Sequence, residues 1–192
     1  MGYKCGRERL TLRVWAALFL VLASFAASSS AIAIKKSNTW DEPAHILAGY
    51  AHLTRGADYL SALNHPVLGR SLTALLPAFF LKLDYDSSLM PEEAEGSNFF
   101  PYSVKFLYEN SASGGRILFL GRLVNILLSA LLGGYLFIWS AELWGVKGGF
   151  FSLFLFIFSP DILAHSGLAA TDIQVSAFFF IALFYLYRLV TR

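Results

Sequence analysis

Charged residues are scarce in this sequence, and their scarcity argues against a soluble enzyme. Only 15% of the 192 residues are charged and 56% are hydrophobic, whereas a soluble domain has about 25% charged and roughly 45–50% apolar residues. The apolar residues also come in long uncharged runs instead of the short amphipathic periods of a globular core. The composition therefore indicates a protein that lies largely in lipid.

Cysteine and an excess of charge of one sign are also lacking. Cys5 is the only cysteine, which excludes a disulfide framework within the chain and a cysteine-based zinc site. Fifteen Lys and Arg against thirteen Asp and Glu leave a formal net charge of +2, without the basic stripe that a nucleic-acid-binding surface needs. The sequence thus predicts no nucleic-acid partner.

Apolar segments predict an all-α, multi-pass integral membrane protein with about four transmembrane helices. A helix needs about 20 residues to cross the hydrocarbon core, and residues 14–34 form an uncharged run of this length. Three further spans are expected, at residues 117–141, 148–165 and 171–189. The link between the second and third spans is brief, so these two should form an antiparallel hairpin.

The first apolar run also permits a second interpretation, a cleaved signal peptide. Basic residues precede it in segment 1–13, and Ala31-Ile32-Ala33 resembles a cleavage site. A retained anchor is favoured, because the run is longer than the roughly 7–15 apolar residues of a signal peptide and because further spans follow.

Basic residues at the two ends of the chain predict its orientation. They cluster in residues 1–13 and recur at Arg188 and Arg192, and the positive-inside rule places such flanks in the cytoplasm. Residues 35–116 then form a large outer first loop. This loop is expected to contain amphipathic helices that lie along the membrane surface.

The start of this loop carries the first candidate chemistry, in the sequence Asp41-Glu42-Pro43-Ala44-His45. At about 100° per residue, Asp41, His45 and His52 fall on one face of a helix, next to an apolar stripe. A surface-lying helix with an exposed polar row is therefore expected. Asp41 is either the N-cap of this helix or a general base that removes a proton from an acceptor hydroxyl.

A second candidate site follows at Asn64-His65-Pro66-Val67-Leu68-Gly69-Arg70. Asn64 and Pro66 suit a helix start, so the motif can be explained as a helix-start signal without any function. In a functional interpretation, His65 holds a metal or a phosphate, and Arg70 offers a planar fork of donors to a phosphate. The histidines lack a recognised zinc spacing such as His-Glu-x-x-His.

The third candidate is Asp172, at the expected start of the fourth span. Thr171-x-x-Gln174 matches a capping box, and an acidic residue in the first turn complements the helix dipole. A catalytic role is the competing interpretation. If both helix starts lie at the outer edge, Asp41 and Asp172 should approach within about 10 Å.

Several motifs together resemble one family of membrane enzymes. In chain order they are Asp41-Glu42-Pro43-x-His45, Gly49-Tyr50, Gly56-x-Asp58-Tyr59, Asn64-His65-Pro66-x-Leu68-Gly69-Arg70, Gly121-Arg122, Ser159-Pro160, Leu163-Ala164-His165 and Thr171-Asp172. Their order resembles the N-terminal part of the GT-C membrane glycosyltransferases, especially the protein O-mannosyltransferase and aminoarabinose transferase superfamily. The resemblance spans about residues 10–190.

The resemblance implies a GT-C-like N-terminal module with a specific activity. Such enzymes transfer a sugar from a polyprenyl-phosphate carrier to a hydroxyl of a protein, lipid or glycan, and a bacterial cytoplasmic membrane is the expected location. Asp41 matches the catalytic carboxylate, with Glu42 beside it, and Asp172 matches the acidic residue that opens the fourth span. Four residues match substrate-binding or phosphate-binding positions: His65, Arg70, Arg122 and His165. No metal ligands are assigned, and a divalent metal cofactor is left open.

The chain departs from the family at two points. The family has a His-Pro-Pro-Leu region where this chain has His65-Pro66-Val67-Leu68. Val67 thus replaces the second proline, and this change affects the local shape of the loop. Family members usually continue for several more spans, whereas this sequence stops at Arg192, so a fragment, a truncated reading frame or half of a split enzyme is expected. An inactive scaffold or accessory subunit is the alternative, and a transporter has little support because the spans lack charge at their midplane.

Overall fold

The computed structural model describes residues 10–55, 65–85 and 99–191, and all regular secondary structure within these ranges is helical. This confirms the all-α prediction. The motif residues Gly56, Asp58, Tyr59 and Asn64, and also Cys5, lie outside the described residues. The helices are α1 (Leu12–Lys35), α2 (Glu42–Arg55), α3 (Val67–Phe80), α4 (Phe99–Tyr108), α5 (Gly114–Ile157), α6 (Pro160–Ser166) and α7 (Asp172–Thr191).

Among the described helices, α1, α5 and α7 are long and apolar enough to cross a membrane. At 1.5 Å per residue, the 24 residues of α1 and the 20 of α7 extend about 36 Å and about 30 Å, which matches a hydrocarbon core of about 30 Å. The predicted spans 14–34 and 171–189 agree with these two helices to within two residues at each end. The protein is therefore a membrane protein with at least these apolar helices.

Helix α5 reverses direction at Gly145, where φ is 75°. Its two arms, residues 114–144 and 146–157, pack against each other in antiparallel fashion: the Phe137 and Phe150 rings lie 4.8 Å apart, and a Cβ on Gly133 would lie 3.1 Å from the Phe156 ring. In a straight helix, residues 133 and 156 would be about 34 Å apart. The predicted hairpin is confirmed, and glycine fits its corner because it tolerates positive φ.

The predicted third span, residues 148–165, is not one continuous helix. The second arm of α5 ends at Ile157, and α6 begins at Pro160 after a break at residues 158–159. Proline restricts the residue before it and cannot donate the hydrogen bond that would continue the helix. The second arm is about 18 Å long, shorter than the core that it would have to cross.

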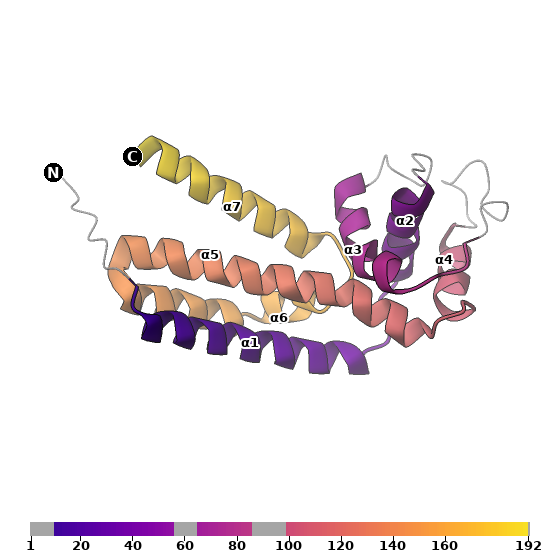
Figure 1. Cartoon of the computed structure of the whole chain (residues 1–192), viewed down its shortest axis with the longest axis horizontal. Coiled ribbons are helices and arrows are strands. Elements are labelled where there is room, and N and C mark those ends of the chain that lie inside the picture. Colours follow the sequence, from indigo (N-terminus) through magenta and orange to yellow (C-terminus); the bar gives the residue numbers. More distant parts are fainter. Residues whose placement is uncertain (1–9, 56–64, 86–98, 192) are drawn as a thin grey trace.

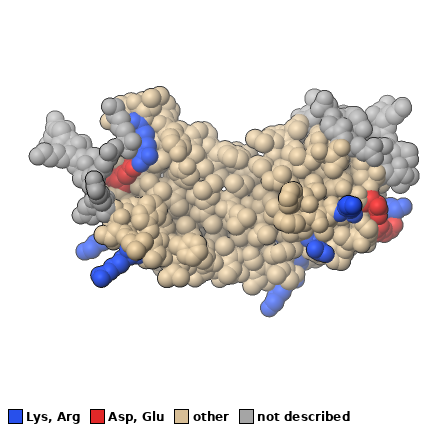
Figure 2. Space-filling view, in the orientation of Figure 1, with Lys and Arg blue, Asp and Glu red and all other residues tan. Residues whose placement is uncertain are grey.

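Two regions follow each other along the molecule (Figure 1). Helix α1 packs on both arms of α5, through contacts that include Leu18 with Phe137 and Leu153, and α7 runs along α5. Helices α2, α3 and α4 gather at the end opposite to the start of α1 and the end of α7. Figure 2 shows charged side chains toward the two ends of the visible face and an uncharged region between them. We call the α2–α4 end the helical cap.

Helix α2 is buried inside this cap and does not lie on its surface. Ile46, Leu47 and Ala51 are 0% exposed, and His45 is 2% exposed. The predicted surface-lying amphipathic helix with an exposed polar row is therefore wrong for α2. Gly49 shows the physical reason, because a Cβ there would lie 1.9 Å from the backbone oxygen of Arg70, so α3 covers α2 at backbone contact distance.

Candidate functional site

A buried ion pair between Glu42 and Arg122 connects the cap to the membrane helices. Arg122 Nε donates to Glu42 Oε1 and Nη2 donates to Oε2, both at 2.7 Å. Nη1 also donates to the carbonyl oxygens of Ala33 (2.7 Å) and Lys36 (2.8 Å), and Nη2 donates to Ser37 O (2.8 Å). All five N–H groups of the guanidinium are thus used, at a side chain only 1% exposed.

The Glu42 carboxylate is equally saturated. It accepts hydrogen bonds from Thr39 N (2.7 Å), Thr39 Oγ1 (3.1 Å) and Ala169 N (2.8 Å) as well as from Arg122. Burial alone would raise the pKa of Glu42, but the hydrogen bonds from Arg122, Ala169 and Thr39 and the charge of Arg122 hold this pKa below its ordinary value. The carboxylate therefore stays ionised and joins α1, α2, α5 and the loop before α7.

This geometry bears on two predicted site residues. Glu42 was predicted as catalytic and Arg122 as a substrate-binding or phosphate-binding residue, and the structure places both in a structural ion pair. The bonds of Arg122 to the carbonyl oxygens of Ala33 and Lys36 place its guanidinium at the end of α1. The catalytic role of Glu42 and the binding role of Arg122 stay predictions, and in this structure both residues serve to hold helices together.

Asp41, next to Glu42, has the opposite environment. Its side chain is 58% exposed, and its Oδ2 lies 3.9 Å from Nε2 of the buried His45. Its carbonyl oxygen accepts the first hydrogen bond of α2, from His45 N at 3.0 Å. Asp41 therefore lies at the start of α2, as expected of a helix N-cap residue. Its carboxylate is exposed and can contact a ligand.

His45 is the centre of a cluster of titratable groups. Burial is the main cause that lowers its pKa to about 4, and the positive charges of Arg70 and His65 lower it further, while Asp41 and Asp172 oppose the shift. All four groups are thus close enough to act on one ring. The His45 and His65 rings meet edge to face at 4.8 Å. The imidazole of His45 is neutral at pH 7.

The first turns of α3 and α7 bring Arg70 and Asp172 to this cluster. A Cβ on Gly69 would lie 2.9 Å from Thr171 Cγ2 and 3.0 Å from Gln174 Oε1, so the two helix starts touch. Asp172 is exposed and Arg70 is buried. Asp41 lies 3.9 Å from His45 and the charge of Asp172 acts on the same ring; the separation of the two carboxylates, under about 10 Å, stays a prediction.

Two other predictions have separate outcomes. His165 lies on α6 with an exposed side chain, and no contact among the described residues joins it to the cluster. Metal binding also finds no support in this part of the chain, because the described residues contain no group of three or more His, Cys, Asp or Glu that could hold an ion.

Sequence reasoning missed Asn125, a 1% exposed residue of α5 that holds the loop before α7. Its Nδ2 donates to Leu168 O and Ala170 O, both at 2.6 Å, and its Oδ1 accepts from Gln174 Nε2 at 3.0 Å. Gln174 thus binds Asn125, and its Oε1 has no hydrogen-bond partner among the described residues, so the predicted capping box with Thr171 is wrong. The available signal was an amide inside an apolar span, a position that is usually functional.

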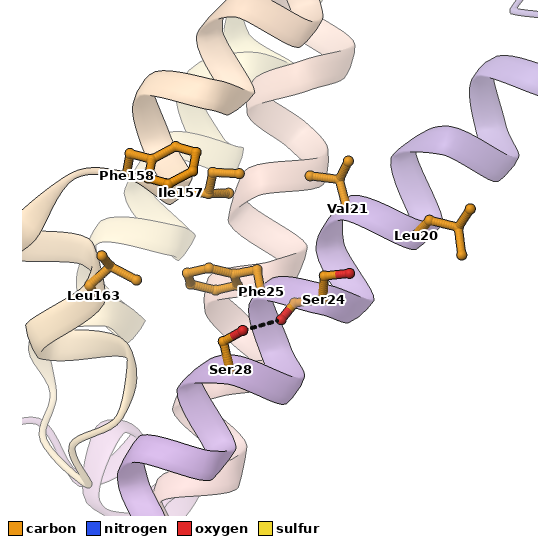
Figure 3. A pocket seen from close by; sticks show the side chains of 8 residues that line it. All are labelled: Leu20, Val21, Ser24, Phe25, Ser28, Ile157, Phe158 and Leu163. Atoms are coloured by element: carbon orange, nitrogen blue, oxygen red, sulfur yellow. Dashed lines mark hydrogen bonds between the residues drawn. The ribbon is translucent and has the colours of Figure 1, made fainter.

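A separate cavity of about 440 Å³ lies between α1, the end of α5 and α6. Figure 3 shows Phe25, Ile157, Phe158 and Leu163 around it, with Ser28 Oγ donating to Ser24 O at 2.8 Å. The residues that line it carry no titratable side chain. This cavity therefore offers no side chain for acid–base chemistry.

No protein-family model matches the chain, and comparisons with curated proteins and with solved structures found no match. The case for a function therefore depends on the chemistry of the cluster and on the order of the motifs in the sequence.

Proposed function

We propose that the chain is a membrane glycosyltransferase, or the N-terminal part of one, that transfers a sugar from a polyprenyl-phosphate carrier to a hydroxyl acceptor. The observation that carries this proposal is the cluster at the helical cap, where the exposed carboxylate of Asp41 borders the buried, neutral ring of His45. Asp172, His65 and Arg70 act on the same ring. The motifs that resemble the GT-C superfamily include each of these residues.

Asp41 is the general base of the proposed reaction. It takes the proton of the acceptor hydroxyl while the acceptor oxygen forms a bond to C1 of the donor sugar. Because burial keeps His45 uncharged, its ring does not compete as a cation with the acceptor for the Asp41 carboxylate at neutral pH. The exposed Asp172 supplies a second carboxylate that orients the acceptor hydroxyl.

The leaving group explains the guanidinium of Arg70 in the cluster. When the bond between C1 and the phosphate oxygen breaks, its electron pair stays on the carrier phosphate. Arg70 remains a cation although burial lowers its pKa, and it supplies a positive potential where this charge develops. In this proposal, the carrier chain lies in the bilayer beside the apolar helices and its phosphate lies at the cap.

In the proposed topology, the cap lies on the outer side of the membrane and both chain ends lie in the cytoplasm. Arg13 at the start of α1 and Arg188 near the end of α7 lie at the same end of the molecule, as the positive-inside rule requires. The second arm of α5 together with α6 would make the third of four crossings, with Ser159-Pro160 as an internal break. Asp161 and Asp172 then lie toward the outer side.

The test compares Asp41→Asn with Asp161→Asn in transfer assays on membranes, with polyprenyl-phosphate sugars as donors. Asparagine keeps the shape and the capping ability of aspartate, so Asp41→Asn should remain folded and lose about 10²–10⁴-fold in activity. Asp161, exposed on α6, controls for the loss of one outer carboxylate and should retain activity. Normal transfer by Asp41→Asn would refute the assigned base, and a folded parent without transfer would favour an accessory subunit.

A further inference from the structure

Three consecutive residues of the loop between α6 and α7 form hydrogen bonds to side chains of other helices. Asn125 Nδ2 donates to Leu168 O and Ala170 O at 2.6 Å, and Glu42 Oε1 accepts from Ala169 N, the residue between them, at 2.8 Å. The Asn125 Oδ1 accepts from Gln174 on the first turn of α7. The side-chain amide of Asn125 thus forms hydrogen bonds to the chain both before and after Asp172.

The planar amide of Asn125 is suited to this contact because it offers two N–H donors and one acceptor on a single group. Both donors and the acceptor are used, and the residue is 1% exposed. Asn125 therefore meets no substrate. An aspartate at this position would point a carboxylate at two carbonyl oxygens, and a leucine would leave both carbonyls without a donor.

A shift of this loop would be transmitted to the catalytic cluster. The first turn of α7 touches the first turn of α3 at Gly69, where a Cβ would already be 2.9 Å from Thr171. A movement of α7 therefore changes the position of Asp172 relative to Arg70 and His45. A misplacement of about 1 Å is enough to lower a reaction rate by about 10²-fold.

We propose that Asn125 is a positioning residue, which sets the exposed carboxylate of Asp172 against the Asp41–His45 pair by fixing the loop and the first turn of α7. This inference rests on the proposed transferase function. Asn125 acts through Asp172 and touches neither donor nor acceptor. Its loss should lower kcat, while KM for the polyprenyl-phosphate sugar should stay within about twofold.

The first measurement is a distance and needs no activity. In a Cys5→Ser background, spin labels are attached at Lys36→Cys, beside the cap, and at Ser176→Cys, on α7. Double electron–electron resonance then measures the distance between the two labels, which reports the position of α7. Asn125→Leu should shift or broaden this distance distribution. Ser129→Ala is the matched control, because it removes a buried hydrogen bond of 2.8 Å to the backbone oxygen of Asn125 and leaves the amide contacts intact.

The second measurement is kinetic, and Gln174→Leu serves it if Asn125→Leu fails to fold. Gln174→Leu removes the tie to α7 and keeps both bonds from Asn125 to the loop, so a smaller fall in kcat is expected. An unchanged distance and unchanged kcat in folded Asn125 and Gln174 variants would overturn the proposal, as would a rise in KM alone. A broadened distance in a chain without transferase activity would refute the catalytic purpose and the proposed function, and leave a purely structural clamp.

Discussion

Replacing Arg122 by methionine leaves the buried Glu42 without its partner. The variant loses two charge-assisted hydrogen bonds to Glu42, and three carbonyl oxygens at the end of α1 and just beyond it lose their donor. Breaking a buried pair in this way costs about 3–5 kcal/mol, and the lost carbonyl contacts favour the upper value. At about 2–4 °C per kcal/mol for a chain of this length, a loss of about 5 kcal/mol lowers the Tm by about 10–20 °C.

The pH dependence of stability should also change sign. In the parent, the folded pKa of Glu42 lies below its ordinary value of 4.5, so its contribution to stability is present above pH 4.5 and is lost as the pH falls through the folded pKa. Without Arg122, burial dominates and the folded pKa rises. Arg122→Met should then lose stability as the pH increases above 4.5.

Thermal unfolding in detergent, followed by circular dichroism between about pH 4 and pH 7, measures both effects. Arg116→Met is the matched control, because Arg116 is an exposed arginine on the same helix and its loss should move the Tm by little. A Tm of Arg122→Met close to that of the parent, or a pH slope of the parental sign, would show that the ion pair does not hold the cap.

Three further outcomes are expected. NMR should find the His45 ring neutral until the pH approaches about 4, with stability falling as the pH decreases from 6.5 toward that value; protonation near its ordinary pKa would contradict the burial of this ring. Gly49→Ala should cost about 1–3 kcal/mol, since its Cβ would lie 1.9 Å from a backbone oxygen, while Gly115→Ala, with no atom within 4 Å, should gain up to about 1 kcal/mol. Equal effects of these two substitutions would disprove the close contact of α2 and α3. Reporter fusions after Ser111 and after Thr191 should report opposite sides of the membrane, and a common side would refute the outer position of the cap.

The long membrane helices are the part of the fold that could be predicted from the sequence. The limits of α1 and α7 follow from uncharged runs of about 20 residues, a local property that needs no knowledge of neighbours. The reversal at Gly145 also followed from local sequence, because the link between two apolar runs was brief. The same reasoning drew residues 148–165 as one helix and underestimated the break that Ser159-Pro160 imposes.

The burial of α2 could not be predicted from its polar and apolar faces alone. His45 and Asp41 share a helix face in the sequence, yet His45 is 2% exposed while the Asp41 side chain is 58% exposed. The difference arises from α3, whose backbone approaches Gly49, and from His65, two residues before α3, whose ring contacts the His45 ring. Helical periodicity gives the direction of a side chain but not the element that covers it.

The sequence by itself determined that this is a helical membrane protein with acidic and basic motifs at the ends of its apolar runs. Only the tertiary structure separated the adjacent carboxylates, Asp41 facing outward and Glu42 buried on Arg122, and only it revealed Asn125 as the holder of the loop before α7. The physical reason is that these roles depend on partners far away in the chain, 80 residues for Glu42 with Arg122 and 127 for Glu42 with Ala169. A carboxylate becomes a structural anion or an available base according to the donors that surround it, and those donors come from other helices.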